Sequence, residues 1–157
     1  MDATTASARL EIRRTFNCPA EKVFQAWADQ QALAQWMGPV DDMEVIVEEH
    51  DFRPDGAYRY RMITRHDDPI RGPAGLHNVV GGKFLEIDAP KKLIFTWRWL
   101  ENGMDVGDSL VTLIFHSQGE QCELVLLHER LPGPEARDAH RDGWEGCLAC
   151  LARYLSA

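Results

Sequence analysis

The sequence of 157 residues contains no long hydrophobic run and no excess of positive charge. Its unbroken apolar stretches are only a few residues long, whereas a transmembrane helix needs about 20. Residues 1–14 contain no apolar core of a secretory signal. Asp and Glu number 25 against 17 Lys and Arg, a formal net charge of −8, and this balance disfavours binding to nucleic acid or anionic membranes. We therefore expect a cytoplasmic protein with no nucleic-acid partner and no membrane insertion.

The common motifs of catalysis and metal binding are also missing. The sequence has no glycine-rich phosphate loop, no G-x-S-x-G nucleophile motif and no H-E-x-x-H metal motif. Only four cysteines occur, and in a chain without a signal they indicate free, buried thiols. Cys147 and Cys150 form a single C-x-x-C pair, whereas structural zinc needs four ligands. We expect no metal and no cofactor.

Hydrophobic periodicity predicts a single domain of the α+β class. Residues 1–8 are small and polar and are expected to form a flexible tail before a domain that spans 9–157. Alternating residues predict a strand at 9–16, and two short helices are expected to follow it, with Pro19 at the start of the first and Asp29 as the cap of the second. A helix is predicted from about Pro134 to Leu155. Six further strands are predicted, at 43–49, 57–64, 78–87, 92–100, 109–117 and 121–131.

Six or seven antiparallel strands twist and curl, so the long C-terminal helix can fill their concave side. Many aromatic residues fall on the inner positions of these strands. Buried Tyr and Trp need partners for their O–H and N–H groups, and a cavity with a bound ligand would supply such partners. The predicted ligand-binding residues are Trp36, Tyr58, Tyr60, Met62, Phe84, Trp97, Trp99, Leu113, Phe115, Leu126, His128, Trp144 and Leu148.

Two polar residues are candidates for acid–base chemistry. His128 shares the inward parity of its strand, and Glu86 has the same parity as Phe84. We expect both to point inward, where a histidine orients a ligand or transfers a proton and a carboxylate needs a partner. On the opposite parity, strand 121–131 carries apolar residues, as do two neighbouring strands. Such an exposed apolar face predicts a homodimer, and its members are Val125, Leu127, Ile94 and Ile114.

An ordered set of segments resembles a known superfamily. The segments are RTFNCPAEKVFQAWADQQALAQWMGP, PDGAYRYRM at 54–62, GGKFLEIDAPKKLIFTWRW at 81–99, SLVTLIF at 109–115, ELVLLHERL at 123–131 and HRDGWEGCLACLARYL at 140–155. The set is similar to the SRPBCC (START-like, Bet v 1-like) superfamily. Within it, the set resembles the branch homologous to the C-terminal domain of the heat-shock-protein-90 ATPase activator.

The resemblance implies a helix-grip fold, in which a curved antiparallel sheet wraps around the C-terminal helix with a cavity between them. It leaves three functions open. The first is binding of a small apolar or aromatic molecule in that cavity. The second is a cyclase- or hydrolase-type enzyme that uses His128 and Glu86. The third is a co-chaperone or stress-response role, with a chaperone as partner.

Overall fold

The computed structural model describes residues 8–39, 43–104 and 106–156. The predicted tail at 1–8 lies outside these residues except for Ala8, which already belongs to the first strand. The chain forms one strand, two short helices, six strands and a long helix. Their bounds are β1 (Ala8–Phe16), α1 (Ala20–Ala28), α2 (Gln30–Trp36), β2 (Glu44–His50), β3 (Ala57–Ile63), β4 (His77–Asp88), β5 (Lys92–Glu101), β6 (Ser109–Gln118), β7 (Gln121–Leu131) and α3 (Pro134–Ser156).

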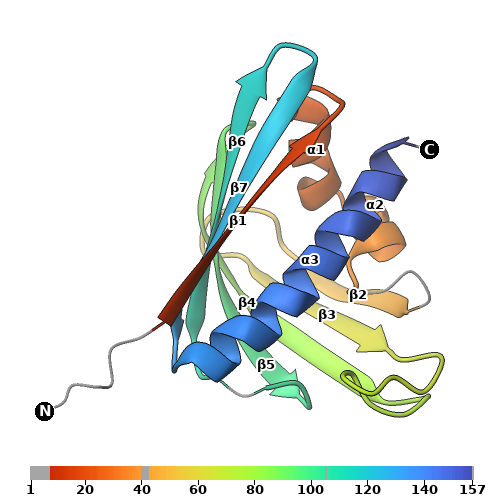
Figure 1. The fold of residues 1–157 in the computed structure, drawn as a ribbon. Helices are drawn as coiled ribbons and strands as arrows, with labels where there is room; N and C mark the ends of the chain where they lie inside the picture. Colours follow the sequence, from red (N-terminus) through yellow and green to blue (C-terminus); the bar gives the residue numbers. More distant parts are fainter. Residues whose placement is uncertain (1–7, 40–42, 105, 157) are drawn as a thin grey trace, which may run out of the picture.

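All seven strands form one antiparallel sheet in the order β1-β7-β6-β5-β4-β3-β2. Helix α3 runs obliquely across one face of the sheet (Figure 1), α2 packs against α3, and α1 packs against α2, β6 and β7. The hydrophobic core fills the space between this face and the three helices. The predicted α+β helix-grip fold is confirmed.

The turn between α1 and α2 follows from local hydrogen bonding. Asp29 ends α1, and its carboxylate accepts a hydrogen bond from the backbone N–H of Gln31. That bond satisfies one of the unpaired donors at the start of α2. Pro19, expected at the first helical position, is instead the N-cap of α1. Its carbonyl accepts hydrogen bonds from the backbone N–H groups of Lys22 and Val23.

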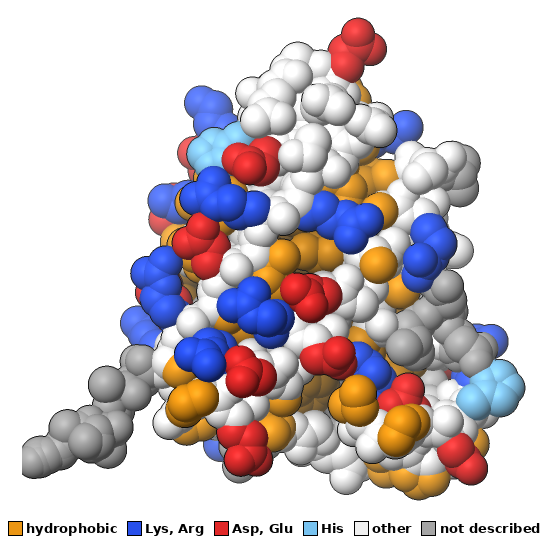
Figure 2. Space-filling view, viewed as in Figure 1, with side chains coloured by type: hydrophobic (Ala, Val, Ile, Leu, Met, Phe, Trp, Pro, Cys, Tyr) orange, Lys and Arg blue, Asp and Glu red, His pale blue; other side chains and the backbone are white. Residues whose placement is uncertain are grey.

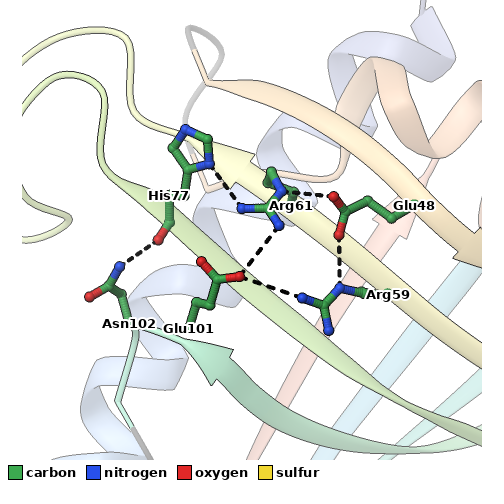
Figure 3. A network of polar contacts seen from close by, with 6 residues as sticks. All are labelled: Glu48, Arg59, Arg61, His77, Glu101 and Asn102. Carbon is green, nitrogen blue, oxygen red and sulfur yellow. Dashed lines mark hydrogen bonds and ion pairs between the residues drawn. The ribbon is translucent and has the colours of Figure 1, made fainter.

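An ion-pair network fastens four strands on the face of the sheet opposite the core (Figure 3). Glu48 of β2 accepts hydrogen bonds at 2.8 Å from both Arg59 and Arg61 of β3. Arg61 also contacts His77 Nδ1 of β4 at 2.9 Å, and both guanidinium groups contact Glu101 of β5. Because residues alternate along a strand, this network holds β3 with Tyr58 and Tyr60 facing the core.

Strand β4 is irregular, and its irregularity corrects one prediction. The register of β4 with β5 shifts between Phe84 and Glu86, which is the signature of a β-bulge. The extra residue reverses the parity, so Phe84 is buried while Glu86 is exposed and pairs with Lys92 at 3.1 Å. The prediction that Glu86 points inward is therefore wrong. Gly82 allows a close approach, because a Cβ there would lie 2.2 Å from the Thr96 carbonyl oxygen.

The outward apolar residues do not form an open hydrophobic face. Val125 is only 3% exposed, and Leu127, Ile94 and Ile114 are half-buried. Charged neighbours such as Arg13, the Cα partner of Val125, stand among them. Side chains of both signs are also interspersed over the α3 face of the molecule (Figure 2). The homodimer remains a prediction, and the apolar face expected to support it is largely covered. Within the described part of the chain, no helix has the length and apolar character to cross a membrane.

Candidate functional site

A small apolar cavity lies between the sheet and the two short helices. The cavity has room for about one water molecule, because the space in which the centre of that molecule could lie is about 10 Å³. The lining side chains are Trp27, Met37, Tyr58, Tyr60, Phe84, Leu93 and Phe95. None of them belongs to α3, so the cavity lies on the α1–α2 side of the core and not, as the sequence predicts, against the C-terminal helix.

The predicted ligand-binding residues divide into three groups. Tyr58, Tyr60 and Phe84 line the cavity. Trp97, Trp99, His128 and Trp144 lie between the sheet and α3, joined by ring contacts and hydrogen bonds. The rest are buried core residues away from the lining: Trp36, Met62, Leu113, Phe115, Leu126 and Leu148.

Four lining residues are absent from the predicted set. Leu93 and Phe95 have the inward parity of β5, and the ring centroid of Phe95 lies 6.2 Å from that of Phe84 and 5.7 Å from that of Tyr58. Trp27 and Met37 come from α1 and the C-cap of α2. Their helical spacing marks them as buried, but no sequence signal shows that the helices meet β3–β5 at this point.

A directed chain of hydrogen bonds occupies both ring nitrogens of His128, which is fully buried. The Trp144 indole N–H donates to Nδ1 at 3.0 Å. Ser109 Oγ donates to the Trp97 carbonyl, so its lone pair accepts from His128 Nε2–H at 2.7 Å. Because an indole only donates and a carbonyl only accepts, His128 must be the neutral tautomer with its proton on Nε2. Neither nitrogen is free for a ligand or a substrate.

A second buried histidine supports the same arrangement. His140 of α3 donates from Nδ1 to the Ala136 carbonyl at 2.8 Å and accepts at Nε2 from the Trp99 indole at 3.1 Å. Its ring centre lies 5.0 Å from that of His128. Burial, together with the neighbouring His140, lowers the pKa of His128 to about 3, and burial lowers the pKa of His140. Nδ1 of His128 and Nε2 of His140 each accept from an indole N–H, so both rings are neutral in this arrangement.

The two cavity tyrosines have already used their protons. His50 donates from Nε2 to the Ala28 carbonyl, so its Nδ1 accepts from the Tyr60 hydroxyl at 3.0 Å. The Tyr58 hydroxyl donates to the Thr96 carbonyl. Burial raises the pKa of both phenols above the usual range and lowers the pKa of His50. The tyrosine oxygens therefore offer only lone pairs to a further partner.

Two of the five indole N–H donors have no partner, and the Thr64 hydroxyl is the other buried side-chain group without one among the described residues. The indole N–H groups of Trp27 and Trp97 make no hydrogen bond, although these residues are only 3% and 4% exposed. The other three tryptophans each donate: Trp36 to the Ala26 carbonyl, and Trp99 and Trp144 to histidines. An unpaired buried donor costs about 1–3 kcal/mol, so Trp27 and Trp97 are the exceptions that a function would explain.

No group of three or more His, Cys, Asp or Glu side chains that could hold a metal ion occurs in residues 8–39, 43–104 and 106–156. All four cysteines are buried, and none of them forms a disulfide. Burial raises the pKa of Cys147, and that of Cys122 to about 11. These thiols are packing residues, in agreement with their pattern in the sequence.

A curved antiparallel sheet that packs against a long C-terminal helix across an aromatic core defines the helix-grip class. The family model described as "Activator of Hsp90 ATPase homolog 1-like protein" matches residues 17–156. The chain therefore belongs to this family, as its sequence segments indicate.

Solved structures agree with this assignment. The AHSA1 protein from Silicibacter pomeroyi is 27% identical, with a TM-score of 0.79 over 95% of this chain and 98% of that one. A protein from Chromobacterium violaceum is 26% identical, with a TM-score of 0.78 over 92% of this chain and 95% of that one. CalU16 from Micromonospora echinospora is 22% identical, with a TM-score of 0.67 over 96% and 77%, and shows the fold alone. No curated protein matches the chain.

Proposed function

We propose that the protein binds a small apolar or aromatic molecule in the cavity between the sheet and helices α1 and α2. The observation that carries the proposal is the enclosed cavity itself, whose seven lining side chains include five aromatic rings and no charge. Ligand sites of this kind are apolar, concave and lined by aromatic residues. Membership of the family supports the same reading.

The cavity must widen to admit a ligand larger than water, and its wall contains a suitable side chain. Met37 follows the short helix α2 and is buried, and a methionine has three rotatable bonds and adapts to irregular spaces. We expect ligand binding to displace this side chain while β3, β4 and β5 keep their positions.

Native mass spectrometry of the protein purified from its own host cells tests the proposal directly. We expect a stoichiometric small molecule that denaturation releases. Toluene and phenol, titrated into the purified protein and followed by NMR, provide an independent test. If the host protein has a clean ligand-free mass and neither probe changes the spectrum at saturation, the proposal is wrong.

A pair of variants locates the site. Met37→Ala enlarges the cavity, so toluene is expected to bind this variant more tightly than the wild type. Leu33→Ala is the matched control, since Leu33 is equally buried in α2 but does not line the cavity. Both truncations cost about 2–5 kcal/mol of stability, and only the first should change the affinity for toluene.

The enzyme alternative has less support than binding. Both nitrogens of His128 are engaged inside the core, and Glu86 lies on the outer surface beside Lys92. The co-chaperone alternative is supported by the description of the matching family. Stimulation of a heat-shock-protein-90 ATPase by stoichiometric amounts of the protein would favour it, and the absence of stimulation would remove it. The four buried cysteines form no disulfide, which supports residence in the cytoplasm, where thiols stay reduced.

A further inference from the structure

The cavity contains one polar group that lacks a partner, and it is a donor. Trp27 lines the cavity, is 3% exposed, and has no acceptor for its indole N–H. Trp97 has the second unpaired indole N–H. Both indoles contact the ring of Trp144, with centroid distances of 6.2 and 4.7 Å, and both contact Phe95 at 6.5 Å. The two free N–H groups thus belong to one aromatic cluster at and beside the cavity.

The remaining polar atoms of the lining accept but do not donate. The Tyr60 proton is committed to His50 and the Tyr58 proton to the Thr96 carbonyl. A group that accepts a hydrogen bond from Trp27 therefore completes the bonding of the cavity. A hydroxyl group can also donate to a tyrosine oxygen, and a carbonyl oxygen can only accept.

The buried polar side chains of the core indicate whether the ligand is charged. Thr64, Ser109, His128 and His140 are the buried polar side chains of the described residues, and no Asp, Glu, Lys or Arg is among them. Each of the two histidines accepts an indole N–H at one ring nitrogen, so both rings are uncharged. An ionised ligand group would lose its hydration here without a counter-charge, which is strongly unfavourable.

We infer that the cavity selects an uncharged, mainly apolar molecule that carries a hydroxyl or carbonyl oxygen, which accepts a hydrogen bond from the Trp27 indole N–H. This inference rests on the proposed function, because it names the chemistry of the molecule that the cavity binds. Trp27 then sets the specificity for a ligand that carries an oxygen acceptor. The uncharged core around His128 and His140 excludes charged ligands.

Phenol, toluene and benzoate are the probes that test the inference. Phenol and toluene have the same shape and differ by a hydroxyl against a methyl group, and benzoate is charged at pH 7. We expect phenol to bind roughly 2- to 10-fold more tightly than toluene, the range of one net hydrogen bond. Benzoate should bind more weakly than either.

The indole N–H resonances of the five tryptophans report the contact itself. Phenol should shift the Trp27 resonance downfield, whereas toluene should not. The resonances of Trp36, Trp99 and Trp144 serve as internal references because their N–H groups are already bonded. This measurement uses the wild-type protein and decides the question even if a Trp27 variant does not fold.

Trp27→Phe removes the donor and keeps an aromatic ring. In this variant the preference for phenol over toluene should disappear. Phe24→Leu is the control, since Phe24 is a buried aromatic of the same helix that does not line the cavity, and it should keep the preference.

The outcomes separate the inference from the proposed function. If toluene binds as well as phenol, if benzoate binds most tightly, or if the Trp27 resonance ignores phenol, the inference is wrong while the cavity remains a binding site. If none of the three probes binds, the inference is wrong; if the protein from its host cells also has a clean ligand-free mass, the proposed function is wrong as well.

Discussion

Acid should destabilise this protein through His128 at a pH well above the range in which carboxylates titrate. In the unfolded chain the histidine has a pKa near its ordinary value of 6.5, and in the folded protein the pKa is lowered to about 3. The folded state therefore binds fewer protons than the unfolded state between these values. Stability is fully present above pH 6.5 and is lost as the pH falls toward 3.

The size of the effect follows from the pKa difference. Each pH unit below 6.5 removes up to about 1.4 kcal/mol for one such group. Lowering the pH from 7 to 5 should therefore lower the free energy of unfolding by about 2 kcal/mol through His128. The lowered pKa values of His140 and His50 add to the loss in the same direction. The structural cause is that a proton on Nδ1 of His128 would face the Trp144 indole N–H.

Urea unfolding at pH 5, 6 and 7 measures this dependence, and a variant isolates its source. His128→Gln keeps an amide that can donate to Ser109 and accept from Trp144 but cannot titrate. It should be less stable than the wild type at pH 7. Because the variant takes up about one proton fewer on unfolding, its stability should fall less steeply as the pH is lowered. His116→Gln changes an exposed histidine of β6 and should follow the wild type.

One result would refute the reasoning. If the wild type and His128→Gln lose stability in parallel between pH 7 and 5, His128 is not the group responsible. An NMR titration provides the check if the variant is too unstable: the ring protons of His128 should not titrate between pH 8 and 5. A midpoint near 6.5 would show that the ring is accessible and that the hydrogen-bond chain is not maintained.

Two further predictions concern packing. Gly143→Ala and Gly146→Ala are neighbouring changes in α3 with opposite expected signs. A Cβ at Gly143 meets nothing within 4 Å, so Gly143→Ala should stabilise the protein by about 0.5–1 kcal/mol. A Cβ at Gly146 would lie 2.1 Å from the Pro39 carbonyl oxygen, so Gly146→Ala should destabilise the protein by about 1–3 kcal/mol. Thermal unfolding of the two variants measures both effects. Equal shifts in melting temperature would contradict this. The buried cysteines should react with a thiol reagent only on unfolding, so rapid modification of native Cys122 or Cys147 at pH 8 would show that the core opens readily.

Periodicity alone was sufficient for most of the fold. The alternation of Tyr58, Tyr60 and Met62 with arginines defines β3 and its buried face, because a half-buried strand must alternate. The order of strands separated by turn residues indicates an antiparallel sheet, and the spacing of apolar residues near the C-terminus indicates the long helix. These signals are local, so they can be read without knowledge of the tertiary structure.

The site depended on contacts between distant segments. A bulge in β4 turns Glu86 outward, and nothing in the local alternation shows it. The cavity forms where Trp27 of α1 and Met37 meet three strands, so α3, the expected partner of the cavity, does not line it. The sequence by itself determined the strands, the helices and the buried face of most of them. Only the tertiary structure decided which buried donors find acceptors: Trp144 reaches His128, whereas Trp27 reaches none, because hydrogen bonding depends on distances of tenths of an ångström that hydrophobic periodicity does not specify.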